Sequence, residues 1–372
     1  MVSQVYLDHN ASALPALEAN LAMRRWIEAG AGNPSSVHRA GRAARAALEG
    51  ARRAVAASLS TEPRQLTFTS GATEALHLAI ASLTRPGDRL LCSAVEHPAL
   101  YGAATRAQVE VERVPVDRAG RLSVNAFLDR LEPSVTLVAL IGAQNELGNC
   151  YPVAELAAAI APRPLLCDAV QLWGKRPLSP TSLGATALTL SGHKIGAPAG
   201  IGALWLAPGV TTCPILSGGA QERGRRAGTE NLLGAIGMGA AAETIPARLT
   251  AQPRIATLAE QLRDQLHSIA GVELLGEPDP AQRLSNTVAF RLCGVEGDLL
   301  LQALDLAGFQ LSSGAACSSG SLEPSSTLLA LGLDSTAARE GLRLSMGPES
   351  TSEELDAFLH CFRGLAERFR QL

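Results

Sequence analysis

The segment that decides the fold contains two apolar runs with polar ends, Leu165-Leu166-Cys167-Asp168 and Ala187-Leu188-Thr189-Leu190-Ser191. The first is followed by Gln171, and the second continues directly into Gly192-His193-Lys194 and the glycine-rich stretch 196–202. Buried parallel strands are short and apolar, and ligands gather where their carboxyl ends meet at one edge of a sheet. The segment therefore predicts an α/β protein with a carboxylate and an amine at that edge.

Outward from this segment, short apolar runs alternate with helical patterns. Alanines and leucines recur at helical spacing against arginines over residues 38–59, which predicts an amphipathic helix. The other predicted strands are 65–69, 89–94, 109–114 and 136–141, and the predicted helices between strands are 73–83, 98–107, 124–131 and 153–161. This alternation indicates βαβ units around a mostly parallel sheet.

The pattern changes near residue 230. Two long helical stretches follow, 232–247 and 254–270, with Pro246 and Pro253 between them. Beyond them the sequence predicts a strand over 286–292, a helix over 297–307, a strand over 341–346 and a terminal helix over 352–369. We therefore expect a large α/β domain over residues 13–250 and a smaller α+β domain made of residues 1–12 and 251–372.

Composition excludes several classes of protein. The 372 residues include 32 Lys and Arg against 35 Asp and Glu, a net charge of -3, whereas nucleic-acid binding favours a basic excess. No apolar run approaches the about 20 residues that cross a membrane, and the first residues show no targeting pattern. The seven cysteines occur singly, without the spacing of zinc ligands or a disulfide framework. We expect a cytoplasmic protein with no metal site and no nucleic-acid or membrane partner.

Lysine is scarce in this chain. Lys175 and Lys194 are the only two, so an enzyme that needs an amine nucleophile has two candidates. Lys194 ends an apolar strand beside glycine-rich backbone, a setting in which the amine could form a Schiff base. An ordinary surface lysine after a strand would show the same local sequence.

Three other strand ends carry polar groups. Asp168 emerges from a buried strand and needs a cationic partner, unless it caps a helix. The turn 69–74, Thr-Ser-Gly-Ala-Thr-Glu, precedes a predicted helix, so its N–H groups and the Thr73 hydroxyl suit a phosphate, although a plain capping box would look similar. Glu96-His97-Pro98 offers an imidazole that could stack on a flat ring and relay protons, or serve only structure.

Residues 312–321 are ten small residues with one thiol, Cys317, in their middle. A run of small residues makes no core, and a cysteine on a surface loop is accessible to substrate and partner, as a nucleophile must be. The other six cysteines stand mostly in apolar contexts, and we assign them to packing: Cys92, Cys150, Cys167, Cys213, Cys293 and Cys361.

Taken together, these motifs resemble the cysteine desulfurase family, pyridoxal-phosphate (PLP) enzymes of the class V aminotransferase group. The resemblance runs from Tyr6-Leu7-Asp8 to the terminal helix, and it implies the fold-type I, aspartate-aminotransferase-like PLP-dependent transferase fold. It rests on 32–38 (Gly-Asn-Pro-Ser-Ser-Val-His), 70–74, 96–98, 168–171, 191–194, 225–229 (Arg-Arg-Ala-Gly-Thr) and Cys317. The long stretch around Cys317 is similar to the family branch whose long loops deliver sulfur directly to scaffold or thiolation proteins.

The resemblance implies roles for the matching residues. Lys194 would hold PLP covalently and remove the substrate α-proton, His97 would stack on the ring and Cys317 would accept sulfur. The other implied cofactor contacts are Asp168 at the pyridine nitrogen, Gln171 at the phenolic oxygen, and Ala72, Thr73, Ser191 and His193 at the phosphate. Thr229 would reach the phosphate of a neighbouring subunit, which implies a homodimer. Asn145 and Arg343 would hold the substrate carboxylate, Arg343 through a bidentate pair.

The implied reaction converts L-cysteine to L-alanine and leaves a persulfide on Cys317. Its sulfur would pass to an acceptor protein of iron–sulfur cluster assembly or a thiolation pathway. Alternatives on the same fold are a selenocysteine or cystine lyase, another PLP lyase or an aminotransferase, in which Cys317 would be dispensable. An inactive cofactor-binding paralogue is the alternative from a different class. The joint retention of four residues argues against it: Lys194, Asp168, His97 and Cys317.

Three segments depart from the usual family pattern. Residues 9–13, His-Asn-Ala-Ser-Ala, stand where Asn-Ala-Ala-Thr-Thr is frequent, and Gln144 stands where a second Asn is common. Residues 347–350, Gly-Pro-Glu-Ser, replace a frequent Gly-Arg-Phe-Thr and so remove a basic residue beside the site. We expect any effect of these departures in substrate preference or partner docking.

Overall fold

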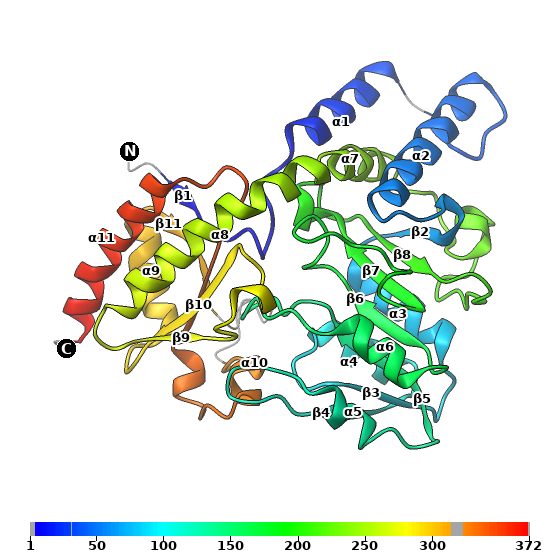
Figure 1. Ribbon diagram of the computed structural model, residues 1–372. Helices are drawn as coiled ribbons and strands as arrows, with labels where there is room; N and C mark the ends of the chain where they lie inside the picture. Colours follow the sequence, from blue (N-terminus) through cyan, green and yellow to red (C-terminus); the bar gives the residue numbers. More distant parts are fainter. Residues whose placement is uncertain (1–3, 31, 314–322, 371–372) are drawn as a thin grey trace.

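The computed structural model describes residues 4–30, 32–313 and 323–370 (Figure 1). Cys317 lies outside the described residues. A seven-stranded sheet forms the larger part, on the right of Figure 1, with strand order β2-β8-β7-β6-β5-β3-β4. Its strands are β2 (Leu66–Thr69), β3 (Arg89–Ser93), β4 (Glu110–Val114), β5 (Val135–Ile141), β6 (Leu165–Asp168), β7 (Ala187–Ser191) and β8 (Gly202–Leu206).

All pairs in this sheet are parallel except those of β8, which runs antiparallel to β2 and β7. The sequence predicted the other six strands and did not predict β8. Gly202 starts β8 where a Cβ atom would lie 2.6 Å from the backbone of Gly71, so the strand and the turn before α3 approach closely only because this residue is glycine. The mostly parallel α/β sheet is confirmed.

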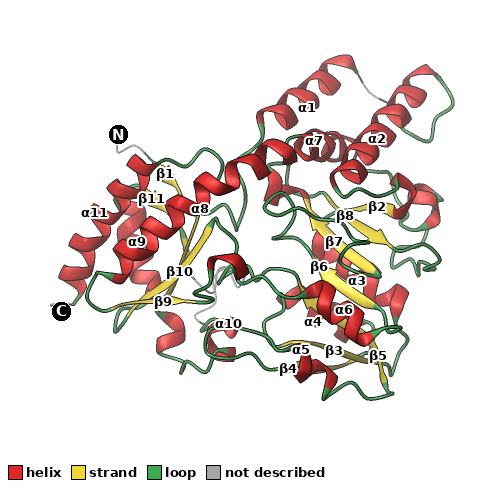
Figure 2. Cartoon of the chain, in the orientation of Figure 1, coloured by secondary structure: helices red, strands yellow, loops and turns green. Residues whose placement is uncertain are grey.

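Helices cover both faces of the sheet (Figure 2). They are α1 (Leu17–Ala29), α2 (Arg39–Ser58), α3 (Ala72–Leu83), α4 (Pro98–Arg106), α5 (Val124–Leu128), α6 (Val153–Ile160) and α7 (Leu232–Glu243). Leu137 and Ala139 of β5 pack with α3 and α4, whereas Val138 and Leu140 pack in the cluster that includes α2 and α7. This alternation follows from the two-residue period of a strand and explains why the sequence of β5 is almost entirely apolar.

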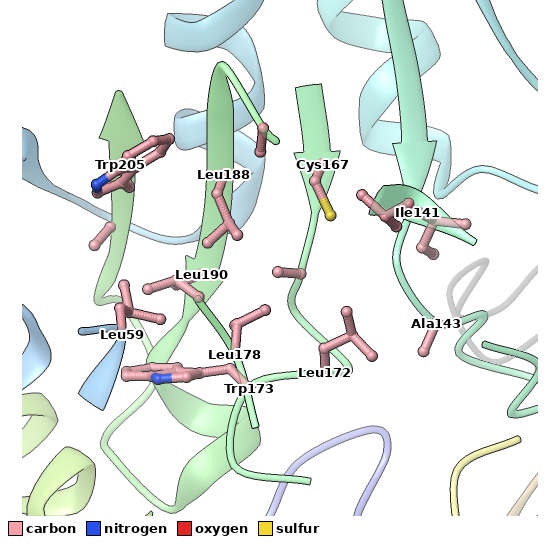
Figure 3. Close-up of a cluster of buried hydrophobic side chains, with 14 of the residues drawn as sticks. Leu59, Ile141, Ala143, Cys167, Leu172, Trp173, Leu178, Leu188, Leu190 and Trp205 are labelled. Atoms are coloured by element: carbon pink, nitrogen blue, oxygen red, sulfur yellow. The ribbon is translucent and has the colours of Figure 1, made fainter. Parts of the chain in front are cut away.

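The larger core cluster is shown in Figure 3, in which Leu188 and Leu190 of β7 and Trp205 of β8 lie with Trp173 and Leu59. Both indoles have hydrogen-bond partners, since Trp173 Nε1 donates to Ser58 Oγ over 3.1 Å and Trp205 Nε1 donates to Thr61 Oγ1 over 2.7 Å. Satisfied indole N–H groups let these large side chains be buried without loss of hydrogen bonding.

The last third of the chain forms a second core, on the left of Figure 1. Its antiparallel sheet has the order β12-β13-β10-β9, and β1 pairs in parallel with β11. The elements are β1 (Val5–Tyr6), α8 (Ile245–His267), β9 (Val272–Leu275), β10 (Thr287–Leu292), α9 (Gly297–Leu306), β11 (Phe309–Gln310), β12 (Ser312–Ser313), α10 (Ser326–Ala330), β13 (Gly341–Ser345) and α11 (Ser352–Phe369). Val5 and Leu7 pack in this core with residues of α11 such as Phe358 and Phe362.

The predicted break between Pro246 and Pro253 is wrong. Helix α8 begins at Ile245 with Pro246 in its first turn and continues past Pro253 to His267. A proline in the first turn removes an N–H that has no helical partner, whereas Pro253 forfeits one internal hydrogen bond. Burial of the following apolar residues, among them Ile255 and Leu262, outweighs that loss.

Candidate active site

A cavity of about 440 Å³ lies where the carboxyl ends of β5, β6 and β7 meet the second core. Among the predicted site residues, those that line it are Ala72, Thr73, His97, Asn145, Asp168, Gln171, Ser191, His193, Lys194 and Arg343. Thr229 is exposed and lines no part of this cavity. Residues separated by up to 271 positions in sequence, from Ala72 to Arg343, thus converge on one cavity.

Lys194 lies in the single helical turn that follows β7 (Gly192–Ile195). Its Nζ donates hydrogen bonds to the backbone carbonyls of Asn10, over 2.6 Å, and Ala11, over 2.9 Å. The amine is therefore held at the cavity wall by the N-terminal segment, which sequence reasoning did not place there. Two carbonyl acceptors stabilise the protonated form of an amine.

Asp168 ends β6 at the floor of the cavity and is buried. Its Oδ1 accepts hydrogen bonds from the Val170 N–H over 3.0 Å and from Thr189 Oγ1 over 3.4 Å. Burial raises the pKa of this carboxyl, although the charges of His97 and Lys194 act in the opposite direction. No α-helix starts at Asp168, so the helix-cap alternative fails, and a buried carboxylate facing a cavity suits a cationic ring nitrogen.

The turn before α3 leaves the helix N-terminus open to the cavity. Gly71 occupies the N-cap position, and no side chain caps the helix there. Glu74 Oε2 accepts the N–H of Ser70, the residue before the N-cap, over 2.7 Å, so the capping box that the sequence allowed is not formed. The first-turn N–H groups and Thr73 at the cavity wall therefore suit a phosphate group.

The two histidines at the cavity have fixed rings. His97 is the N-cap of α4, and its Nδ1 accepts the Ala99 N–H over 3.1 Å, so its structural role and its place in the cavity coexist. His193 Nδ1 lies 3.3 Å from Ser12 Oγ. Burial, and then the charge of Lys194, lower the pKa of His193 to about 4, so its ring is neutral at pH 7.

Glu96, beside His97, is buried, and its hydrogen bonds link the end of β3 to the end of β5. Its Oε1 accepts hydrogen bonds from Ser93 Oγ over 2.6 Å and from the Ile141 N–H over 2.9 Å. Burial raises the pKa of this carboxyl from 4.5 to about 7, while these hydrogen bonds act in the opposite direction. Between pH 4.5 and 7 the folded protein keeps a proton that the unfolded chain loses, so stability falls as pH rises through this window.

The variant Glu96→Gln tests this coupling, because an amide does not titrate. Relative to wild type, the variant is expected to gain free energy of unfolding as pH rises from 4.5 to 7, by on the order of 3 kcal/mol. Chemical denaturation at several pH values, with equal cofactor loading, measures the difference. Parallel stability curves would show that Glu96 titrates normally.

Arg343 on β13 marks the opposite end of the cavity. Its Nη2 donates to Asp8 Oδ1 over 2.6 Å and to Ser312 Oγ over 3.0 Å, and its Nη1 donates to the Asn145 carbonyl over 3.1 Å. Its Nε is buried without a hydrogen-bond partner among the described residues. An unsatisfied buried guanidinium donor is costly, and a carboxylate is the group that satisfies it best.

Sequence reasoning missed the network behind the cavity. Lys175 is buried, and its Nζ donates to Asn10 Oδ1 over 2.7 Å and to Gln171 Oε1. Gln171 Nε2 donates to the Asn10 carbonyl over 3.0 Å, so the orientation of this amide is fixed. Burial, and then the charge of Lys194, hold the pKa of Lys175 well below its usual range. The only sequence feature that singled out Lys175 was the scarcity of lysine. It suggested a nucleophile, whereas Lys175 orients Gln171 by a hydrogen bond.

Two of the segments that depart from the family pattern, 9–13 and 347–350, lie against each other beside the hydrogen bonds of Lys175. The His9 ring packs so closely on Gly347 that a Cβ atom there would lie 2.1 Å from His9 Cε1. Arg254 of α8 donates to the backbone carbonyls of Ser350, over 2.6 Å, and Pro348. The segment 347–350 is therefore held from outside by a guanidinium of α8.

The remaining cysteines differ in exposure. Cys92 and Cys167 are buried, and Cys150, Cys293 and Cys361 are half-buried, in keeping with packing. Cys213 is exposed, so its assignment to packing is wrong. Within the described part of the chain, no group of three metal-ligating side chains could hold an ion, and no helix is long and apolar enough to cross a membrane.

Comparisons with known proteins agree along the whole chain. A family model described as aminotransferase class-V matches residues 5–358. Cysteine desulfurases of Cereibacter sphaeroides and Rhodobacter capsulatus are 39% and 40% identical to the chain, over 100% and 95% of its length and 98% and 94% of theirs. A solved structure described as a NifS-like protein superposes with a TM-score of 0.90 at 27% identity, covering 98% of this chain and 100% of that one.

Proposed function

The chain belongs to the aminotransferase class-V family, and on that premise we propose that it is a PLP-dependent cysteine desulfurase that takes sulfur from L-cysteine onto Cys317. The observation that carries the proposal is the convergence of the family's cofactor and substrate motifs on one cavity. Relatives that bear the name cysteine desulfurase match the chain end to end.

The cavity residues fit PLP by their chemistry. Lys194 supplies the covalent anchor, and Asp168 supplies the carboxylate for the pyridine nitrogen. Gln171 would hold the phenolic oxygen and His97 would stack on the ring, while the α3 N-terminus with Ala72, Thr73, Ser191 and His193 would hold the phosphate; all of these residues line the cavity. Bound PLP supplies an electron-withdrawing ring that stabilises negative charge on the substrate α-carbon.

At the other end, Arg343 and Asn145 hold the substrate carboxylate. Arg343 lines the cavity, and its guanidinium is the cation that suits this carboxylate. Lys194 Nζ accepts the α-proton, and the carbonyls of Asn10 and Ala11 stabilise the ammonium that forms. The N-terminal segment therefore acts as a fixed support for the base.

Cys317 then acts as the nucleophile. Its thiolate attacks the substrate sulfur, so an S–S bond forms and the Cβ–S bond breaks. The electron pair of the broken bond stays with the carbon skeleton, which takes up protons and leaves as L-alanine. The sulfur is oxidised and the carbon is reduced, so this step needs no external oxidant. A thiol reductant or an acceptor protein afterwards removes the sulfur from the persulfide.

Two further parts of the proposal concern partners. Thr229 is exposed and lies outside its own cavity, which suits a contact with the cofactor phosphate of a second subunit in a homodimer. The sulfur acceptor is a protein, either an iron–sulfur scaffold or a thiolation enzyme. The described cysteines are free thiols, which suits the reducing cytoplasm that we propose as the compartment.

The direct test is product formation from L-cysteine by the PLP-loaded protein in the presence of a thiol reductant. We expect alanine and sulfide in equal amounts, because one Cβ–S bond breaks in each turnover. A mixture of pyruvate, ammonia and sulfide would indicate a lyase of a different kind. Bound cofactor with no product from cysteine, but alanine from selenocysteine, would indicate a selenocysteine lyase.

A further inference from the structure

The half-buried carboxylate of Glu146 joins the loop after β5 to the chain immediately beyond residues 314–322. Glu146 Oε2 accepts a hydrogen bond from Ser325 Oγ over 2.6 Å, and its Oε1 accepts one from Thr327 Oγ1 over 2.6 Å. Ser325 is the N-cap of α10, and Thr327 lies in the first turn of that helix. Both carboxylate oxygens are thus committed to hydroxyls more than 170 residues away.

We call the contacts of Glu146 with Ser325 and Thr327 the junction. Gln144, which stands where the family commonly has Asn, also belongs to it. Gln144 Nε2 donates to Thr327 Oγ1 over 2.9 Å, while its Oε1 accepts the N–H groups of Glu146, over 2.6 Å, and Leu147, over 2.8 Å. The Thr327 hydroxyl therefore donates to the carboxylate and accepts from the amide. Each of these polar groups has a partner, so the buried cluster is satisfied.

The junction adjoins the substrate end of the cavity. Asn145, between Gln144 and Glu146, lines the cavity, and its carbonyl accepts a hydrogen bond from Arg343. Ser312, which precedes residues 314–322 on the other side, accepts a hydrogen bond from Arg343 Nη2 over 3.0 Å. On one side of residues 314–322, Ser312 is therefore bonded to the cavity residue Arg343; on the other side, Ser325 and Thr327 are bonded to the two neighbours of the cavity residue Asn145.

We propose that Glu146, oriented by Gln144, is a positioning residue that fixes the chain beyond Cys317 so that its thiolate reaches the substrate sulfur. The inference rests on the proposed function. Glu146 acts through Ser325 and Thr327 and takes no part in PLP binding or in removal of the α-proton. Weakening the junction therefore slows sulfur transfer and leaves the chemistry at the α-carbon unchanged.

The test uses Thr327→Val, which keeps the shape of the side chain. The variant lacks the hydroxyl that bonds to Glu146 and Gln144. Two rates are measured on PLP-loaded protein: single-turnover persulfide formation on Cys317 from L-cysteine, by mass spectrometry, and exchange of the L-alanine α-hydrogen with deuterated solvent. We expect persulfide formation to fall at least about tenfold, the size expected for a lost hydrogen bond to a charged group. We expect α-hydrogen exchange to stay within about twofold of wild type.

Two matched variants accompany it. Ser326→Ala removes an exposed hydroxyl between the two junction residues, and we expect neither rate to change. Thr327→Ser keeps the hydroxyl and is expected to restore persulfide formation. If Thr327→Val fails to fold, Gln144→Asn with the same two rates replaces it, with a smaller but equally selective slowing expected.

Equal slowing of both rates, or no slowing of either, overturns the inference, because a purely structural contact would not distinguish the two steps. The proposed function is judged separately on the wild-type protein. Wild-type protein that exchanges the α-hydrogen of alanine but forms no persulfide from cysteine contradicts the proposed function, and the inference falls with it. Normal persulfide formation in both wild type and Thr327→Val contradicts the inference alone.

Discussion

Replacing Lys194 by alanine is expected to remove the absorbance of covalently bound PLP and to lower turnover of L-cysteine by more than about 1,000-fold. The amine lies at the cavity wall between two carbonyl acceptors, where we assign it both the covalent bond to the cofactor and the removal of the α-proton. One substitution therefore removes two functions. An absorbance spectrum of the purified protein and a steady-state assay of alanine formation measure them separately.

Lys175→Met is the matched control, because it changes the only other lysine in the chain. Lys175 lies behind the cavity wall, bonded to Gln171 and Asn10, and does not line the cavity. The variant is expected to keep the absorbance of covalently bound PLP. The assignment of the anchor would be wrong if Lys194→Ala kept this absorbance and normal turnover, or if Lys175→Met lost the absorbance while remaining folded.

The parts of the fold that sequence predicted are those set by local periodicity. Strands such as β5 and β6 are apolar throughout because both faces are buried, and the helices between them repeat at helical spacing. Helix α1 was missed because Leu17 and Ile27 are exposed, so its apolar residues form no buried stripe. The path of α8 through Pro253 was missed because tertiary burial decided it.

The residues of the site also divide into those that a local pattern predicts and those that only tertiary contacts place. Asp168 and Lys194 were found because Asp168 ends an apolar strand and Lys194 follows one closely, and strand ends meet at one edge of a parallel sheet. Asn10 was missed, although its carbonyl accepts hydrogen bonds from both Lys194 and Gln171. Its position depends on the N-terminal segment crossing from the second core to the cavity, and no local pattern encodes that path.

The other contacts that sequence did not predict are hydrogen bonds between residues far apart in the chain. Gln144 was visible only as a departure from a motif, and its meaning came from Thr327, which lies 183 residues away. Arg343 was assigned by resemblance, but its bonds to Asp8, Ser312 and Asn145 follow from the meeting of three distant segments. Sequence thus identified side chains that line the cavity and left out the groups that orient them.

Replacing Cys317 by alanine is expected to abolish formation of both alanine and sulfide from L-cysteine, by more than about 1,000-fold, because no other group is assigned to attack the substrate sulfur. The variant is expected to keep the absorbance of covalently bound PLP and to exchange the α-hydrogen of L-alanine at the wild-type rate, since Lys194 is untouched. Product assays and exchange into deuterated solvent measure these two halves of the reaction.

Cys213→Ala is the matched control, because Cys213 is the exposed cysteine among the described residues and so the one most open to incidental sulfur uptake. We expect this variant to make alanine, sulfide and persulfide as wild type does. Persulfide on Cys213 in the Cys317→Ala protein, with alanine still forming, would move the acceptor role to Cys213. Alanine and sulfide from a protein lacking both thiols would mean that the sulfur leaves without a protein nucleophile, and the chain would then be a lyase on this fold.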